Sequence, residues 1–145
     1  MRLAVFVASI CISSSALADP ISESKALYIE LASLGPVLID LVGTSDGDAE
    51  TVAKKIETEI VSPVGEATQR WMDAAFNGEG SADSYRPYAS CLEAATALQD
   101  LASHYQRYLR GRDLAPPRSE AAQPFVTGID ACAVALGLPA SGLSE

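Results

Sequence analysis

One uninterrupted stretch, from Tyr85 to Arg110, most constrains the fold of this chain of 145 residues. Apolar side chains recur in it at steps of three and four, the spacing that gathers them on one face of an α-helix. These residues are Cys91, Ala95, Leu98, Ala102, Tyr105 and Leu109. The stretch also holds the chain's single histidine, His104. The sequence therefore predicts one long amphipathic helix against which the rest of the chain packs.

Three further segments repeat this helical spacing. The first covers residues 22–42, with a stripe of Leu27, Leu31, Leu34, Leu38 and Leu41. The second runs from near Asp48 to about Phe76, with Val52, Ile56, Ile60, Val64, Ala67 and Trp71 on its apolar face. The third follows Ser119, with Val126, Ile129, Cys132, Ala133 and Leu136 facing inward. Each stripe is the pattern of a helix with one buried face.

Prolines and glycines divide these segments. Pro36 predicts either a kink in the first helix or two short helices that meet there, and Pro63 predicts a bend in the second. Gly111 is expected to end the central helix. The connectors are expected at 43–47, 77–81 and 114–118, and Gly137 with Pro139 should stop the last helix. Serine side chains favour helix starts, so we expect Ser84 and Ser119 to cap the third and fourth helices.

Four helical segments with short connectors predict an all-α fold, a small four-helix bundle with up-down-up-down topology. The alternative is a buried strand at residues 37–42 (VLIDLV). No second strand is evident to pair with it, and an unpaired strand leaves its backbone groups without hydrogen bonds.

Residues 1–18 have the pattern of a cleaved secretory signal peptide, with Arg2, an apolar core from Leu3 to Ile12, and Ala16-Leu17-Ala18 before the cut. The apolar run is about half the ~20 residues that a membrane anchor requires. A lipoprotein would use Cys11, but the bulky Ile10 precedes it. We therefore expect a periplasmic or secreted protein that begins at Asp19 and has no transmembrane segment after cleavage.

The remaining residues, 19–145, suffice for one domain with a single core. They contain 19 acidic and 9 basic residues, a net charge of −10. Nucleic acids and anionic membranes need a cationic surface, so both are excluded as partners. The acids concentrate before residue 85, whereas Arg107, Arg110, Arg112 and Arg118 fall close together after it. These arginines are either a solvated surface or part of a contact with a partner of opposite charge.

Cys91 and Cys132 lie on the inward stripes of the last two predicted helices. In an exported domain such a pair is expected to form a disulfide, worth ~4 kcal/mol in the chain-entropy model. The alternative is a redox-active pair of thiols, but the sequence has no C-x-x-C motif.

The sequence offers no convincing constellation for catalysis, a metal or a cofactor. Residues 43–47 (GTSDG) match G-x-S-x-G, but the fold that uses that motif needs several parallel strands and a longer chain. Asp46, Asp48 and Glu50 suggest calcium, yet an EF-hand starting at Asp46 would need glycine where Thr51 stands. One histidine and a paired cysteine couple leave too few ligands for structural zinc. We therefore expect neither an enzyme nor a bound metal.

The layout is similar to soluble four-helix cytochromes b in size and helix order. Such a protein would use His104 and Met72 as axial ligands inside the bundle. His104 falls off the apolar stripe, between Asp100 and Arg107, which favours a surface position with charged neighbours instead.

Tyrosines beside arginines are typical of residues that anchor protein–protein contacts. The central helix carries such a group, which we predict to bind a protein partner: Tyr105, Arg107, Tyr108 and Arg110. The alternative is that the tyrosines bury their rings in the core and expose only their hydroxyls.

These observations favour an exported, non-enzymatic binding protein, most concretely an inhibitor that caps a periplasm-acting enzyme. Immunity proteins against cell-wall-degrading toxins are similar in size, export and helix content. An acid-responsive periplasmic chaperone is the first alternative, since the acid-rich N-terminal part would lose charge at low pH and loosen. A b-type haem carrier is the second. The sequence leaves the identity of the partner and the oligomeric state open.

Overall fold

The computed structural model describes residues 19–43, 48–78 and 82–140, and no strand occurs within these ranges. The helical elements are α1 (Pro20–Gly43), α2 (Ala49–Ile56), the π-helical turn η1 (Glu57–Val61), α3 (Ser62–Asn77), α4 (Ala82–Tyr85), the 3₁₀ turn η2 (Arg86–Tyr88), α5 (Ala89–Leu109), the 3₁₀ turn η3 (Ser119–Ala122) and α6 (Gln123–Ala135). The predicted signal peptide and most of the 43–47 loop lie outside the described residues.

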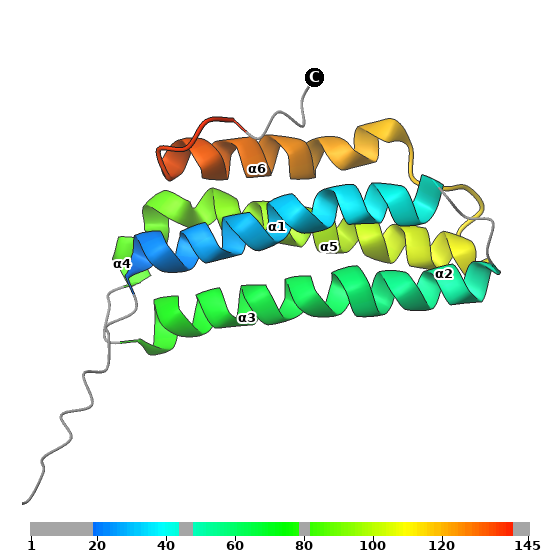
Figure 1. Cartoon of the computed structure of the whole chain (residues 1–145), viewed down its shortest axis with the longest axis horizontal. Helices are drawn as coiled ribbons and strands as arrows, with labels where there is room; N and C mark the ends of the chain where they lie inside the picture. The colour runs from blue at the N-terminus through cyan, green and yellow to red at the C-terminus, as the bar shows by residue number, and fades with distance from the viewer. Residues whose placement is uncertain (1–18, 44–47, 79–81, 141–145) are drawn as a thin grey trace, which may run out of the picture.

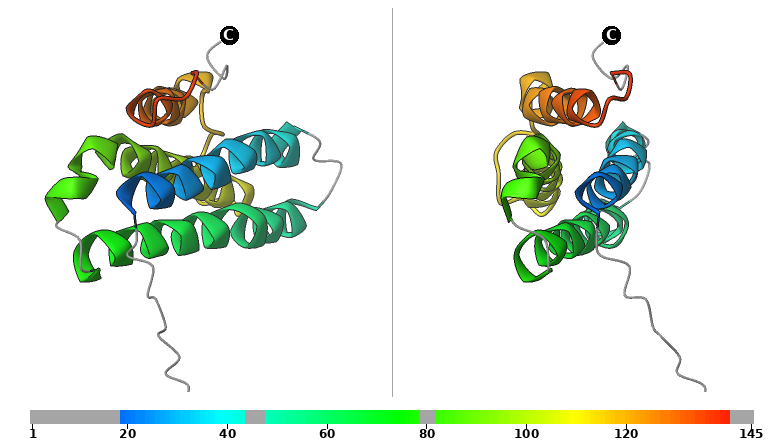
Figure 2. Two further views of the ribbon diagram at one scale, coloured as in Figure 1. Left: turned by 60° about the vertical axis from the view of Figure 1, so that its left-hand side comes forward. Right: turned by 90° about the vertical axis from the view of Figure 1, so that its left-hand side faces the viewer.

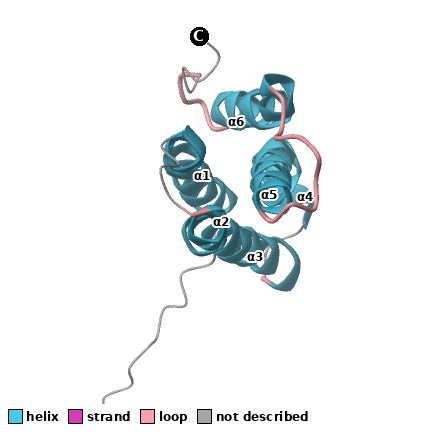
Figure 3. Cartoon of the chain, turned by 90° about the vertical axis from the view of Figure 1, so that its right-hand side faces the viewer, coloured by secondary structure: helices cyan, strands magenta, loops and turns pink. Residues whose placement is uncertain are grey.

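The elements form four antiparallel helical rods. In Figure 1, α1 runs to the right, α2 and α3 return to the left, α5 runs to the right again and α6 returns. Seen from the end, the rods surround a common centre, with α6 opposite α2 and α3 (Figure 3). This confirms the predicted all-α four-helix bundle, and residues 37–42 belong to α1 rather than to a strand.

The predicted apolar stripes make the core. Leucines of α1, the Val52-to-Trp71 stripe and the inward residues of α5 and α6 share one buried cluster. Phe125, Ala94 and Ala75 are buried as well, although the sequence analysis did not single them out. Regular spacing therefore located most of the core, and the additions are neighbours on the same helix faces.

α1 continues through Pro36 as one helix, so of the two predicted alternatives the single helix is correct and the two shorter helices are not formed. By length and composition it is the one helix among the described residues that is suited to cross a membrane. In the bundle it buries Leu27, Leu31, Leu34 and Leu38 against the other helices and leaves Ile29 and Ile39 exposed.

The bend expected at Pro63 takes the form of the π-helical turn η1, which ends two residues before the proline. Proline lacks an N–H, and its ring clashes with the carbonyl four residues earlier in a regular α-helix. That carbonyl belongs to Glu59, inside η1. The wider turn lets the rod continue as α3, with the Ser62 N–H donating to the carbonyl of Glu57.

Neither serine acts as the predicted cap. Ser84 lies inside α4, and the chain turns through η2 before α5 begins at Ala89. Ser119 begins the 3₁₀ turn η3, and α6 starts only at Gln123. Pro124 explains this later start, because a proline without an N–H fits the first turn of a helix.

Glycines end α5 and α6 as predicted, each with a positive φ, of 68° at Gly111 and 69° at Gly137. After α5, the Gly111 N–H donates to the Tyr108 carbonyl and the Arg112 N–H to the Arg107 carbonyl. The same paired pattern follows α6. Both are Schellman motifs, which need a left-handed residue that glycine adopts without strain.

The disulfide between Cys91 and Cys132 is confirmed and joins α5 to α6, with a Cα–Cα distance of 4.7 Å. Close to it, a Cβ added at Gly128 would lie 3.0 Å from the Ala94 Cα, so the two helices approach closely there. Figure 2 shows α6 lying over α5 and α1, on the side away from α3. The bridge therefore fixes α6 to α5.

Candidate functional site

The side of α5 that no other rod covers forms a surface groove, with a volume of about 580 Å³. α5 supplies most of its lining, and the start of α6 supplies one edge. The residues of this α5 groove are Leu92, Glu93, Thr96, Ala97, Asp100, Leu101, His104, Arg107, Ala121 and Pro124. Its walls are apolar, and its charged groups stand on the α5 side.

A second hollow, of about 770 Å³, lies under the chain that connects α5 to α6. We call it the connector hollow. Its lining consists of His104, Asp113, Leu114, Ala115, Pro116, Arg118, Glu120 and Ala121. His104 and Ala121 line both hollows, so the two adjoin there, and we call the pair the depression.

Asp113 fastens the connector to the end of α5. Its Oδ2 accepts a hydrogen bond from the Arg107 Nε at 3.0 Å. The His104 Nε2 lies 3.6 Å from the same oxygen, too far for a hydrogen bond but within reach of an ion pair when His104 is protonated. The backbone N–H of Arg112 also donates to the Arg107 carbonyl, at 2.8 Å. The base of the connector is thus held by side-chain and main-chain bonds together.

The residue that follows Asp113 is the most exposed apolar side chain in the described structure. Leu114 is fully solvent-exposed, whereas Pro117, three residues later, is buried. An apolar side chain held outward on a fastened connector makes an anchor that a partner can cover.

The structure separates the four residues predicted to bind a partner. Arg107 lines the α5 groove. Tyr108 is 37% exposed and follows His104 by one helical turn, so it stands on the same side of α5. Tyr105 instead lines an apolar cavity of about 110 Å³ between α1, α5 and α6. Arg110 points toward α2, where its Nε lies 3.4 Å from the Glu50 Oε2.

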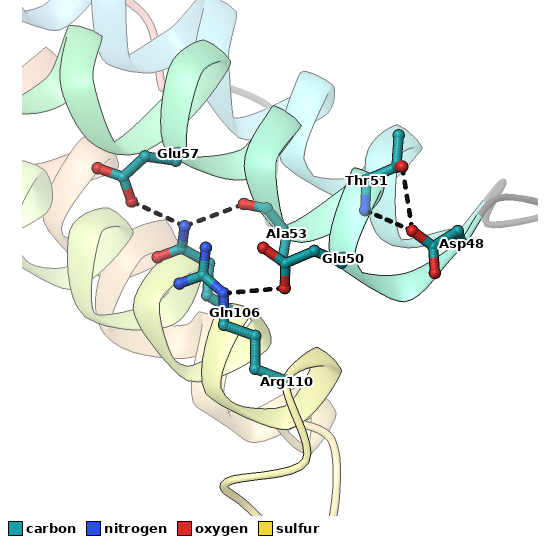
Figure 4. A network of polar contacts seen from close by, with 7 residues as sticks. All are labelled: Asp48, Glu50, Thr51, Ala53, Glu57, Gln106 and Arg110. Carbon is teal, nitrogen blue, oxygen red and sulfur yellow. Dashed lines mark hydrogen bonds and ion pairs between the residues drawn. The ribbon is translucent and has the colours of Figure 1, made fainter.

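Arg110 belongs to a polar network that joins α5 to α2 (Figure 4). At its centre, the Gln106 Nε2 donates to the Ala53 carbonyl at 3.0 Å and to the Glu57 Oε2 at 2.8 Å. Gln106 is only 6% exposed, although a polar side chain is not expected in a helix core from its type alone. Its position four residues after the buried Ala102 was the available signal, since that spacing keeps a side chain on the same face.

Asp48 has the role of a helix cap. Its Oδ2 accepts hydrogen bonds from the Thr51 N–H and hydroxyl, each at 3.2 Å. The described residues contain no group of three or more His, Cys, Asp or Glu side chains able to hold a metal. Asp46 and most of the G-x-S-x-G motif fall outside the ranges that the structure describes.

His104 and Met72 do not meet inside the bundle. Met72 is 37% exposed and follows Trp71, whose ring packs against Tyr85 just before α5 begins. His104 lies near the opposite end of α5, beside the connector. The structure therefore does not bring together the two haem ligands that the sequence suggested.

No family model, curated protein or solved structure matches this chain. Any account of its function therefore depends on the geometry of its own surface.

Proposed function

We propose that this chain is an exported, non-enzymatic binding protein, most concretely an inhibitor or immunity-type protein that caps a periplasm-acting enzyme. The observation that supports this function is the depression made by two adjoining hollows, the α5 groove and the connector hollow, with the exposed Leu114 in its lining. Export is inferred from residues 1–18, and the disulfide fits an oxidising compartment.

The depression has the composition of a protein-binding surface. Leu92, Leu101 and Pro124 supply apolar walls, and Arg107 lines the groove beside them. Tyr108 does not line the depression, but it is exposed on the neighbouring turn of α5, and Arg and Tyr are the residue types that most often anchor contacts between proteins. Apolar surface surrounded by charged groups gives both affinity and orientation.

The surface is also held in place before binding. Asp113 ties the connector to α5, and the disulfide ties α6, which forms the other edge, to the same helix. A surface that is already ordered loses less conformational entropy when a partner binds. This suits an inhibitor, which must compete with the substrate of its target.

Capture of partners from a periplasmic extract of the host, with the oxidised chain 19–145 as bait, begins the test. The affinity of each captured protein is then measured for the wild-type chain and for the variant Arg107→Ala/Tyr108→Ala. Truncation of interface anchors should weaken binding at least tenfold, by about 1.4 kcal/mol or more. Leu114→Ser should weaken binding too, because it removes the exposed apolar anchor.

Arg70→Ala is the matched control, since Arg70 is exposed on α3, away from the depression. It should bind the partner like the wild-type chain. Equal affinity of the Arg107→Ala/Tyr108→Ala variant and the control would remove the depression as the binding site.

One observation favours the acid-responsive chaperone as a second candidate. Four apolar side chains on α1, those of Ile21, Ile29, Val37 and Ile39, are exposed in the folded chain. A chaperone would enlarge this surface at low pH, and binding of an apolar dye near pH ~3 would rise as the near-ultraviolet circular dichroism fell. Unchanged dye binding and dichroism would leave the inhibitor as the better account.

A further inference from the structure

Two acidic side chains along the α5 groove, those of Glu93 and Asp100, have no paired cation. Glu93 and Asp100 are exposed, and neither carboxylate has a hydrogen-bond or ion-pair partner among the residues that the structure describes. They are seven residues apart on α5, so they stand on the same side of the helix and roughly 10 Å apart along its axis.

The other charges of the depression do not pair with these two carboxylates. Asp113 already engages Arg107, and Arg118 belongs to the connector hollow together with Glu120. The carboxylates of Glu93 and Asp100 therefore face solvent over an apolar floor. The net charge of residues 19–145, −10, adds a long-range attraction for cations.

The surface between the two carboxylates allows another helix to approach closely. Thr96 and Ala97 stand there, and neither carries a long side chain. Leu92, Leu101 and Pro124 form the apolar sides of the groove. A small residue at the centre of a helix face with apolar flanks suits a second helix, whose apolar side chains can fill the groove.

We propose that the α5 groove binds a cationic amphipathic helix of the partner protein, with Lys or Arg at positions i and i+7 and an apolar residue between them. Seven residues give the two cations the same spacing as Glu93 and Asp100, so both ion pairs form in one alignment. The apolar residue at i+3 or i+4 lies on the same side and enters the groove over Ala97. This inference rests on the proposed function, because it names the kind of partner that the same surface takes.

The probe is a synthetic alanine-based helical peptide with lysines at i and i+7 and a leucine at i+4. A matched peptide of the same composition has its second lysine at i+5, which turns that lysine to another side of the helix. Binding to the labelled, oxidised chain is followed by fluorescence anisotropy and by backbone amide NMR. The i+7 peptide should bind about tenfold more tightly, and its shifts should gather at residues 92–104.

The variant Glu93→Gln/Asp100→Asn should lose that preference, and added salt should abolish it in the wild-type chain. Glu59→Gln/Glu66→Gln is the control, because Glu59 and Glu66 are exposed, are also seven residues apart and lie outside the groove. It removes the same charge and should bind the peptide like the wild-type chain. Equal binding of the two peptides, equal effects of the two double variants, or no saturable binding of either peptide would overturn the inference.

The experiments distinguish failure of the proposed function from failure of the cationic-helix proposal. A captured partner whose affinity falls with Arg107→Ala/Tyr108→Ala but not with Glu93→Gln/Asp100→Asn would keep the proposed function and refute the cationic helix. Absence of any partner would refute the proposed function, whereas the peptides would still report on the groove.

Discussion

Single buried polar groups define how the rods fit together. The Trp71 Nε1 donates to the Ser24 Oγ at 2.8 Å, and both residues are buried between α3 and α1. The Gln106 Nε2 likewise donates to the Ala53 carbonyl, which links α5 to α2. Each bond links helices that are distant in sequence, and each satisfies a group that would otherwise be costly to bury.

Ser24→Ala leaves the Trp71 N–H buried without its acceptor. The free energy of unfolding should fall by about 1–3 kcal/mol. Trp71 is the single tryptophan, so denaturant unfolding followed by its fluorescence measures the loss directly. Ser33→Ala is the control, since the exposed Ser33 hydroxyl donates only to the Glu30 carbonyl of its own helix. Equal stability of the two variants would contradict a structural role for the buried bond.

Glycines at two helical positions should respond oppositely to alanine. At Gly128 the added Cβ would lie 3.0 Å from the backbone of Ala94, so Gly128→Ala should lower the free energy of unfolding by about 1–2 kcal/mol. At Gly65 the nearest atom lies 4.0 Å away, so Gly65→Ala should raise it by about 0.5–1 kcal/mol through helix propensity. Thermal unfolding followed by circular dichroism distinguishes the two. A stabilising Gly128→Ala would show that α5 and α6 are not closely packed there.

Tyr85 makes the stability depend on pH at the alkaline end. Burial, with the carboxylates of Glu23 and Asp19, raises the pKa of its hydroxyl. An unfolded tyrosine has a pKa near 10, so this contribution to stability is complete below pH ~10 and is lost as the pH rises through the raised folded pKa. Tyr85→Phe should therefore flatten the alkaline fall in the free energy of unfolding. An identical alkaline slope in wild type and Tyr85→Phe would refute this assignment.

The sequence predicted the positions of the helices well and the residues at which they begin less well. Stripes at steps of three and four located all four rods, because burial of one helix face dominates the pattern. Gly111 and Gly137 ended helices as expected. The predictions that Ser84 and Ser119 cap helices are wrong, because Pro87 and Pro124 shift the starts of α5 and α6 to later residues. The π-helical turn before Pro63 was not foreseen, since a bend can take several backbone forms.

The disulfide is the covalent link between the last two elements. Cys91→Ala/Cys132→Ala should lower the free energy of unfolding by roughly 2–5 kcal/mol, because it removes a constraint on the unfolded chain. Denaturant unfolding of this variant, and of the wild-type chain with and without reductant, measures the effect. Reductant should destabilise the wild-type chain and leave the variant unchanged. Equal stability of the oxidised and reduced wild-type chain would contradict the prediction.

At the scale of the whole molecule, the sequence predicted the bundle but only part of the candidate site. Arg107 and Tyr108 do stand on the open side of α5. Tyr105 and Arg110 turn toward neighbouring rods. Tyr105 is two residues before Arg107, and Arg110 is two residues after Tyr108, and residues two apart point to nearly opposite sides of a helix. Leu114 and Asp113 were missed, since the fold of a connector depends on tertiary bonds that spacing does not reveal. The spacing of seven between Glu93 and Asp100 predicts that they share one face of a helix. That this face lines a groove is evident only from the structure.

The central claim is that the open side of α5 and the connector form the partner-binding surface. Backbone amide NMR of the labelled, oxidised chain 19–145, titrated with the captured partner, tests it most directly. The account predicts that shifts and line broadening gather at residues 92–108 and 112–121, with α3 unaffected. Perturbations confined to α1 and α3, with residues 92–108 and 112–121 unchanged, would contradict the claim.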